Sequence, residues 1–430
     1  MKTKFISIGL AAAGTASLHA AYMPDMNDSS KIWSLSASLR TFYDDNYTTV
    51  SAGKHGSFGV QLSPQVEINT ALRQTEFGAR YIYGVSYYEQ RDSLGQDPFD
   101  QTHQFDLWVD HAFTERWQAR VQDSFVVAQE PELLAPSSTP LAVKQRVSGN
   151  NIVNTARISL HTDWTRLFST EIAYQNTLYD YENRGGNAAS PSRAGLLNRL
   201  EHLASIDFQW HVSRPTMVFV GYQYGLVNYT GNEVIAQFPP VPLAPLIVYR
   251  SNSRDNDSHY GYVGVQHSFL ENLTGNVRLG AQYTDNYNDP NSTTSIGPYA
   301  SASLVYTYSA GSYAQIGLTH SRNATDQIAP DATGHITQDQ ESTIVYSSVN
   351  HRLTPKLTAS AVVNFQDSEY HNGAFGGQSD DFYSVGLNLS YAFARHFSGE
   401  VGYNFDDYVS GVPGNSYTRN RVYLGVSASY

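Results

Sequence analysis

The sequence predicts an all-β protein, a transmembrane antiparallel up-and-down β-barrel of about 18 strands. Apolar and polar residues alternate through most of the chain, which is the pattern of half-buried strands. Only 15% of the residues are charged, against about 25% in ordinary soluble domains. Short turns alternate with long polar connections, as they do in outer-membrane barrels.

The N-terminus has the pattern of a secretory signal peptide, which we expect to occupy residues 1–20. Lys2 and Lys4 precede an apolar stretch, and Leu18-His19-Ala20 offers a small-residue cleavage site. The apolar stretch is shorter than the ~20 residues of a membrane-spanning helix, and no such run follows it. We therefore expect residues 21–430 to form one barrel domain that crosses the membrane with strands.

The first clear hairpin lies between residues 56 and 87. Phe58, Val60 and Leu62 share one face of the first segment, and a short break is expected at 69–72. Phe77 and Tyr81 then alternate with polar residues along the second segment. Each segment exceeds the roughly 9–11 residues that a tilted transmembrane strand needs.

A turn motif recurs along the chain. An aromatic residue or His and then an apolar residue precede a three-residue polar turn, roughly every 40–57 residues. The copies are His111–Trp117, His267–Leu273, His351–Leu357 and Tyr391–Phe397, with a looser copy at Trp210–Thr216. This spacing suits one hairpin plus one longer loop per copy.

Long connections lie between these turns and are rich in Asp, Asn, Gly, Pro and Ser. They fall at about 44–55, 90–101, 129–149, 181–196, 230–253, 285–296, 322–340, 369–380 and 407–418. The count gives about 18 strands, or 16 if a weak segment such as Gly149–Asp163 is not a strand. We expect short periplasmic turns, long extracellular loops and both termini in the periplasm.

Two soluble folds compete with this prediction, a β-propeller and a lectin-like sandwich, and both would pack their strands around a dry core. Here aromatic residues bracket aliphatic ones on a single face. Tyr383 and Tyr391 flank Val385, Leu387 and Leu389, while small polar residues lie opposite. This arrangement is typical of a lipid-facing band with aromatic girdles and favours the membrane barrel.

The last segment resembles the closing strand of a bacterial outer-membrane barrel. Val422, Leu424 and Val426 alternate with polar residues up to the terminal Tyr430, and such a terminal aromatic is read by the barrel-assembly machinery. We expect Tyr430 to be the assembly signal. The last strand should pair with the first, which would place Arg421 beside Arg40.

The predicted lumen face contains most of the charge within the strands. One interpretation is a polar channel in which opposed charges set solute preference, and the other is an interior filled by ion pairs. About 18 strands favour a water-filled channel unless loops plug it, and the mixed signs indicate at most a mild cation preference. The pore-lining candidates are Arg40, Glu67, Glu76, Arg80, Asp106, Asp110, Arg120, Arg157, Glu171, Arg199, Glu201, Asp207, Arg278, Glu400, Asp406 and Arg421.

No pattern indicates catalysis, a metal site or a cofactor. The chain has no Cys, no HExxH and no recognisable Ser/His/Asp arrangement. His111, His267 and His351 recur near turns on the predicted lipid face, which suggests interface residues rather than ligands. The excess of 39 acidic over 27 basic residues argues against nucleic-acid partners.

Two loop features remain open. The pairs Asp44-Asp45, Asp380-Asp381 and Asp406-Asp407 are either solvated loop acids or a divalent-cation site that bridges lipopolysaccharide. The Pro-rich stretch at 238–249 is expected to lack regular structure. It would fold into the mouth, contact a partner or lie against the rim.

Residues 33–131 resemble the putative β-barrel porin 2 family. The similarity rests on Phe42-Tyr-Asp-Asp-Asn46, Gly56-Ser-Phe58, Tyr81–Tyr88, His103-Gln-Phe105 and Gln122-Asp-Ser-Phe125 ahead of Glu130-Pro131. The resemblance implies an outer-membrane barrel of poorly defined function in a Gram-negative bacterium, with some relatives encoded near exopolysaccharide genes. It implies no catalytic residues.

The leading hypothesis is a porin-like barrel for passive passage of small hydrophilic solutes or saccharides. The alternative is a plugged or non-conducting barrel with a role in structure, adhesion or exopolysaccharide export. An outer-membrane phospholipase or protease would need a constellation of catalytic side chains that the sequence does not show. The expected partners are outer-membrane lipid, lipopolysaccharide and the assembly machinery. A homo-oligomer is suggested only by analogy with porins.

Overall fold

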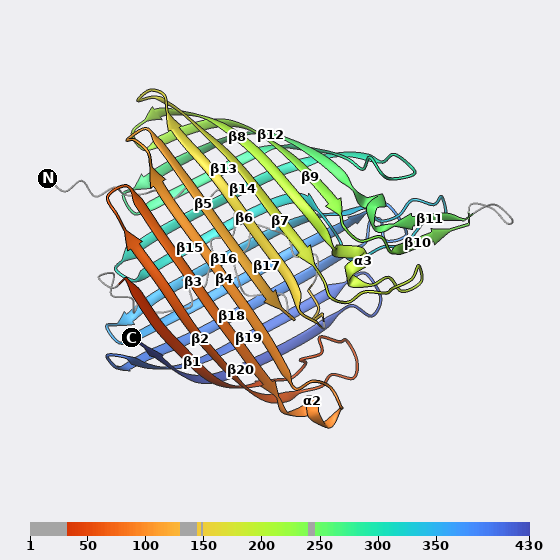
Figure 1. Ribbon diagram of the computed structural model, residues 1–430, viewed down its shortest axis with the longest axis horizontal. Helices are drawn as coiled ribbons and strands as arrows, with labels where there is room; N and C mark the ends of the chain where they lie inside the picture. The colour runs from red at the N-terminus through yellow and green to blue at the C-terminus, as the bar shows by residue number, and fades with distance from the viewer. Residues whose placement is uncertain (1–31, 130–143, 148, 240–245) are drawn as a thin grey trace.

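A computed structural model describes residues 32–129, 144–147, 149–239 and 246–430, and these form a barrel of 18 antiparallel strands (Figure 1). The predicted fold and strand number are therefore confirmed, whereas the signal peptide at 1–20 lies outside the described residues. The barrel strands are β1 (Trp33–Asp44), β2 (Ser57–Ala71), β3 (Thr75–Tyr88), β4 (Phe99–Ala112), β5 (Trp117–Ala128), β6 (Asn151–Asp163), β7 (Phe168–Asp180), β8 (Arg199–Ser213), β9 (Thr216–Tyr229), β12 (Asn256–Leu270), β13 (Leu273–Asp285), β14 (Thr294–Ser309), β15 (Ser312–Asn323), β16 (Asp339–Thr354), β17 (Leu357–His371), β18 (Ser379–Ala394), β19 (Phe397–Ser410) and β20 (Tyr417–Ser429).

The barrel closes where the two ends of the chain meet. β1 pairs with β2 on one side and with β20 on the other, and every barrel strand pairs antiparallel with two neighbours. The predicted pairing of the last strand with the first is confirmed. Closure leaves no strand edge with unsatisfied backbone groups in the membrane.

The two ends of the barrel differ, and we call them the short-turn end and the long-loop end. Short connections such as 72–74 and 310–311 lie at the end where β1 begins and β20 ends (Figure 1). The predicted break at 69–72 is displaced, because Asn69–Ala71 still pairs with β3. The weak segment expected at Gly149–Asp163 is β6, so the alternative of 16 strands is wrong.

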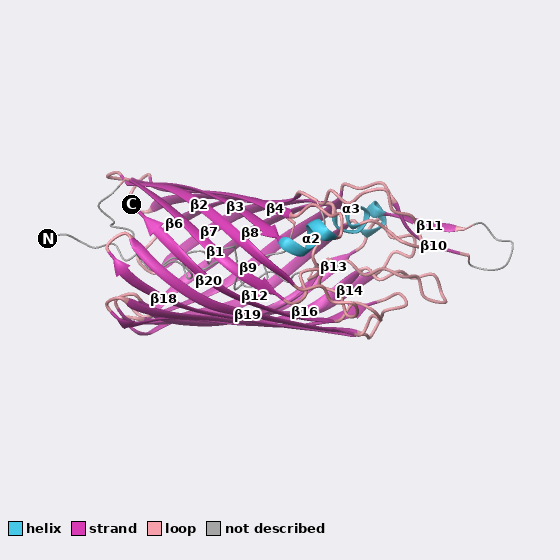
Figure 2. Cartoon of the chain, turned by 90° about the horizontal axis from the view of Figure 1, so that it is seen from below, coloured by secondary structure: helices cyan, strands magenta, loops and turns pink. Residues whose placement is uncertain are grey.

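The long-loop end contains small additional elements (Figures 1 and 2). They are α2 (Glu89–Ser93), α3 (Arg193–Leu197), the 3-10 helix η1 (Ser251–Arg254) and the hairpin of β10 (Val234–Phe238) with β11 (Ile247–Arg250). Among the described residues, no helix is long and apolar enough to cross a membrane.

The hairpin of β10 and β11 corrects the prediction that the Pro-rich stretch lacks regular structure. Phe238 pairs with Ile247, and the hairpin projects away from the barrel wall (Figure 1). The prolines fall between the two strands in the sequence, while the strands themselves contain β-branched and aromatic residues and no Pro. Residues 240–245 lie outside the described part of the chain.

Apolar side chains cover the outside of the barrel, and polar side chains lie inside. On β20, Val422, Leu424 and Val426 are about half or more exposed, whereas Tyr423 between them is 7% exposed. A soluble propeller or sandwich would bury its aliphatic face, so this inverted pattern excludes both. The aliphatic surface instead matches the lipid-facing band of a membrane barrel.

Glycines on the inner wall make room for aromatic rings from neighbouring strands. A Cβ on Gly402 would lie 2.1 Å from the Tyr423 ring, and one on Gly221 would lie 2.2 Å from the Tyr262 ring. The rings therefore occupy the space over the glycine backbone, an arrangement that protects weak strand positions. It also keeps large side chains from filling the lumen.

Candidate functional site

All sixteen charged residues predicted to line the pore lie on the inner face of the barrel. Side chains of a strand point alternately to its two faces. Each candidate lies on the face opposite to the exposed aliphatic residues of its own strand or of the strand paired with it. Arg40 thus lies inside while Leu39 is 47% exposed, and Glu400 lies inside while Val401 is 50% exposed. The strand period therefore places these residues on one face of the wall, and their pore-lining role stays a prediction.

Most of these charges are neutralised by partners close by on the same wall. Arg80 and Asp106 are directly opposed on β3 and β4, with 2.7 Å between Nη2 and Oδ2. Arg120 and Asp110 are directly opposed on β4 and β5 at 2.5 Å. Arg199 contacts Glu201 two residues along β8 at 2.6 Å.

Other pairs reach over an intervening strand. Arg40 on β1 contacts Glu400 on β19 at 2.7 Å across β20, where Gly425 leaves space for both side chains. Arg278 on β13 contacts Asp207 on β8 at 3.4 Å, across β9 and β12. These short-range pairs fit the second interpretation of the inner charges, an interior with ion pairs, and the effect of the charges on solute preference stays a prediction.

Two acidic candidates near the short-turn end have no ion pair to a described residue. Glu67 accepts hydrogen bonds from Gln65 and Asn69 on its own strand. Glu76 lies opposite Asp110 in the register of β3 with β4. These carboxylates leave negative charge on this part of the inner face.

The Phe42–Asn46 motif closes the seam of the barrel. Asp44 is fully buried and accepts hydrogen bonds from the guanidinium groups of both Arg419 and Arg421 on β20. Asn46 donates to the Thr418 carbonyl at 3.0 Å. Arg421 therefore lies opposite Asp44, and the expected position beside Arg40 is wrong, because the register places Arg40 opposite Gly425.

The second acidic pair is also structural. Asp380 is fully buried and accepts hydrogen bonds from the hydroxyls of Tyr370, Tyr408 and Ser410. Asp380 and Asp44 are thus not solvated loop acids, because protein donors have replaced water around them. Among the described residues, no group of three or more His, Asp or Glu side chains is arranged to hold a metal ion.

The third acidic pair divides between the two faces of β19. Asp406 lies on the inner face and is 6% exposed, whereas Asp407 lies on the outer face. Adjacent strand residues point to opposite sides, so these two carboxylates cannot chelate one ion.

The short segment Lys144–Val147 lies across the long-loop end of the barrel. The Lys144 carbonyl accepts a hydrogen bond from Tyr417 on β20, and Arg146 contacts Asp100 on β4 at 2.7 Å. Burial lowers the pKa of Lys144, while the carboxylates of Asp380 and Asp326 oppose this shift. Sequence reasoning missed this cation, since a loop lysine has no periodicity to reveal its position.

Three long loops and Val147 of this segment form a small apolar core. Val147, Leu197, Ile235, Tyr249 and Ile336 are buried against one another. They come from segments that follow β5, β7, β9 and β15, so the loops pack on each other at the mouth of the barrel. Such packing holds the long-loop end in one arrangement.

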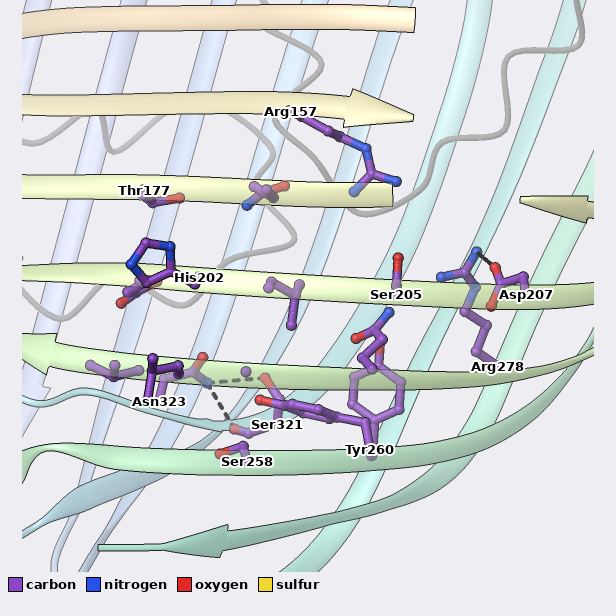
Figure 3. Close-up of a pocket in the computed structure, with 18 of the residues that line it drawn as sticks. Arg157, Thr177, His202, Ser205, Asp207, Ser258, Tyr260, Arg278, Ser321 and Asn323 are labelled. Atoms are coloured by element: carbon purple, nitrogen blue, oxygen red, sulfur yellow. Dashed lines mark hydrogen bonds and ion pairs between the residues drawn. The ribbon is translucent and has the colours of Figure 1, made fainter. Parts of the chain in front are cut away.

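A cavity of about 180 Å³ lies against the inner wall between β6 and β15 (Figure 3). Its charged lining residues include Arg157, Glu171, Asp207 and Arg278. The tyrosines Tyr260 and Tyr299 also line it, with ring centroids 5.3 Å apart. Strand alternation in the sequence predicted that these charged residues point inward. It did not predict that four or more strands bring them to one cavity.

The three recurring histidines lie on the outer face near the short-turn end. Each places its Nδ1 2.8 Å from a hydroxyl of the neighbouring strand: His111 with Thr75, His267 with Thr216 and His351 with Tyr308. Polar tips at this level suit the boundary between lipid and water.

The closed wall, the apolar outer band and the polar lumen together define a porin-like barrel of the bacterial outer membrane. The chain belongs to the putative beta-barrel porin 2 family, whose sequence model matches residues 34–430. The resemblance seen in the N-terminal motifs is thereby confirmed. Proteins of this family and fold are typically channels rather than enzymes. A search among curated proteins gave no match.

Solved structures also match most of the length of this chain, at low identity. OccAB4 of Acinetobacter baumannii is 12% identical, with 94% of this chain and 100% of that chain covered and a TM-score of 0.43. OpdK of Pseudomonas aeruginosa is 9% identical, with 93% and 99% covered and a TM-score of 0.44. A BenF-like porin of Pseudomonas fluorescens Pf-5 is 11% identical, with 93% and 99% covered and a TM-score of 0.45.

Proposed function

We propose that this barrel lets small hydrophilic solutes or saccharides pass passively across the outer membrane. The observation that carries the proposal is a closed wall of 18 strands whose polar inner face encloses a cavity. The long loops would face the cell exterior, and the short turns and both termini would face the periplasm, as in bacterial single-chain barrels. The solute would move down its own gradient, since nothing in the proposal requires an energy source.

Reconstitution of the purified barrel in planar lipid bilayers tests this proposal. We expect stepwise increases of conductance in potassium chloride. The reversal potential in a salt gradient should show weak selectivity with at most a mild cation preference, because most inner-face charges are paired locally. Complete absence of conductance steps from folded protein would contradict a channel.

The segment Lys144–Val147 gives a reason to keep the plugged barrel as a second candidate. It contacts β4, β20 and α3 and would therefore narrow the long-loop end. A barrel closed in this way would serve envelope structure, adhesion or an exopolysaccharide-export partner. Recovery of a specific cross-linked partner, with no conductance, would favour that role.

A variant that lacks one contact of the Lys144–Val147 segment distinguishes a channel narrowed by this segment from a barrel without such a constriction. Tyr417→Phe deletes the hydroxyl that donates to the Lys144 carbonyl. If the segment narrows an open channel, the variant should conduct more than the unmodified barrel. Tyr403→Phe is a matched control, because its hydroxyl contacts Asn420 on β20 and not the segment. Equal conductance of both variants and the parent would argue against a constriction at this segment.

A further inference from the structure

The cavity between β6 and β15 contains one ion pair that differs from the other pairs of the inner wall. Arg157 on β6 and Glu171 on β7 have their closest N and O atoms 3.7 Å apart, beyond hydrogen-bond distance. Each of the two side chains is 14% exposed and lines the cavity. The charges of the other pairs that line this cavity have closer partners.

Those closer partners account for the remaining charges of the lining. Glu201 accepts from Arg199 at 2.6 Å, and Asp207 accepts from the Tyr262 hydroxyl at 2.5 Å. Arg278 contacts Asp207 (Figure 3). Its guanidinium also lies over the Phe219 ring. One guanidinium and one carboxylate are therefore left, and within the described part of the chain neither forms a hydrogen bond.

Each of these two charges is largely withdrawn from water and has no hydrogen bond to a described residue, so the site favours a ligand or water that supplies the missing partners. Gln175 lies directly opposite Arg157 on β7, and its buried Oε1 accepts no hydrogen bond either. The unused groups thus comprise the donors of Arg157 and the acceptors of Glu171 and Gln175. A matching ligand needs an acceptor group and a donor group close together.

We propose that this cavity is a binding site for a small zwitterion of the α-amino acid class. The ligand carboxylate would accept from Arg157, and its ammonium would donate to Glu171. A simple anion at Arg157 would be repelled by Glu171, and a simple cation at Glu171 would be repelled by Arg157. A solute with both charges on adjacent carbon atoms satisfies both groups and leaves the net charge of the lining unchanged.

The opposite side of the cavity suits the rest of such a molecule. Tyr260 lies across from Arg157 and, with Tyr299, offers aromatic surface, while Ser258 and Asn323 offer polar groups (Figure 3). The volume of about 180 Å³ lies below the ~300–1,000 Å³ of drug-sized pockets, so a compact solute fits better than a chain of sugars. This inference rests on the proposed channel function and names one class of its solutes.

Four solutes with one carbon skeleton test the charge requirement. They are L-alanine as the zwitterion, L-lactate as the anion, L-alaninol as the cation and L-lactamide as the neutral molecule. Each is added to a conducting barrel in a planar bilayer. We expect a saturable, concentration-dependent interruption of the ion current by alanine and a weaker, non-saturating effect of the other three. A response to lactate or alaninol equal to that of alanine would overturn the proposal that the ligand is a zwitterion.

Variants of the two charged residues test the site itself. Arg157→Gln and Glu171→Gln should each raise the half-saturating alanine concentration about tenfold or more, because each loses a charge-assisted hydrogen bond. Arg120→Gln is the matched control, since its hydrogen-bonded pair with Asp110 lies outside the cavity lining. Heat-modifiability on gels verifies that all three variants fold. An unchanged alanine response in Arg157→Gln would overturn the site.

Equilibrium dialysis of labelled alanine against the detergent-solubilised barrel separates this inference from the channel proposal. Saturable binding that is lost in Glu171→Gln would support the site even if the barrel does not conduct. Conductance without alanine binding would leave the channel intact and overturn only the zwitterion site.

Discussion

At the residue scale, one buried carboxylate connects the two ends of the chain. Asp44 receives hydrogen bonds from Arg419 and Arg421 and from the backbone N–H of Asn46. All these groups lie where β1 meets β20, which is the contact that joins the two ends of the barrel sheet. The Phe42–Asn46 motif therefore has a physical role in sealing the barrel.

We expect Asp44→Asn to weaken this seam. The change leaves two guanidinium groups around a neutral side chain, and loss of one partner of a buried pair costs roughly 3–5 kcal/mol. Urea titration of the folded band on gels measures the effect. Asp92→Asn, in the exposed first turn of α2, is the control and should unfold like the parent. Equal midpoints for both variants would contradict a structural role of Asp44.

Tyr430 is the second residue whose role can be tested. Its backbone pairs with Leu35, and its ring lies 5.6 Å from Trp33 and 5.9 Å from His396. We expect Tyr430→Ala to reduce the amount of heat-modifiable barrel in outer membranes, because the terminal aromatic is the predicted assembly signal. The purified variant should still refold in detergent, since the backbone pairing survives. Normal amounts of barrel in the membrane would contradict the assigned role.

At the element scale, the long loops form a packed assembly. Glu233, just before β10, accepts from the backbone N–H groups of Gly185 and Gly186 and from the Ser192 hydroxyl at 2.6 Å. The loop between β7 and β8 is thereby held against the hairpin of β10 and β11. Neither the helices nor this hairpin follows from strand periodicity.

Acid should release this connection. Burial alone would raise the pKa of Glu233, but the hydrogen bonds from Ser192, Gly185 and Gly186 outweigh it and lower the pKa. A carboxylate with a lowered pKa stabilises the folded loops above its unfolded pKa, about 4.3, and the contribution is lost as the pH falls through the lower folded value. Pepsin cleavage at 181–198 should therefore increase below about pH 4.

Glu233→Gln is the comparison for this experiment. It keeps the shape but removes the charge, so its loop should be cleaved faster than the parent loop above about pH 4 and at a similar rate below it. The ratio of the two rates at each pH cancels the pH dependence of pepsin itself. Parallel pH dependence in the parent and the variant would show that another group controls the loop.

At the scale of the whole molecule, polarity is inverted relative to a soluble protein. Leu62 on β2 is 43% exposed on the outer face, and the next residue, Ser63, lies on the inner face. We expect Leu62→Arg to destabilise the membrane-embedded barrel by about 2–4 kcal/mol, since that is the cost of a cationic side chain near the bilayer midplane. Ser63→Arg should be tolerated, because its side chain reaches the polar lumen.

Guanidinium unfolding in lipid vesicles measures both arginine variants. The prediction depends on a difference between adjacent positions, so general effects of arginine on expression or folding cancel. A larger loss in Ser63→Arg than in Leu62→Arg would mean that the assignment of the two faces is reversed.

Much of the wall could be read from the sequence because a strand has a period of two residues. That period fixed the class of fold, the face on which Arg157 and Glu171 lie and the short-turn positions around His111 and His351. It failed at strand ends, where Asn69–Ala71 still belongs to β2, because the ladder of hydrogen bonds extends into polar segments.

By itself, the sequence determined that this chain forms a lipid-facing barrel with a polar interior, since alternation is a local property of each strand. Only the tertiary structure decided which charges meet. The register places Arg421 against Asp44, and glycines at 425 and 221 let pairs reach across strands. The tertiary structure also leaves Arg157 and Glu171 without closer partners among the described residues of the lumen. The sequence could not predict this, because it depends on the positions of several strands at once.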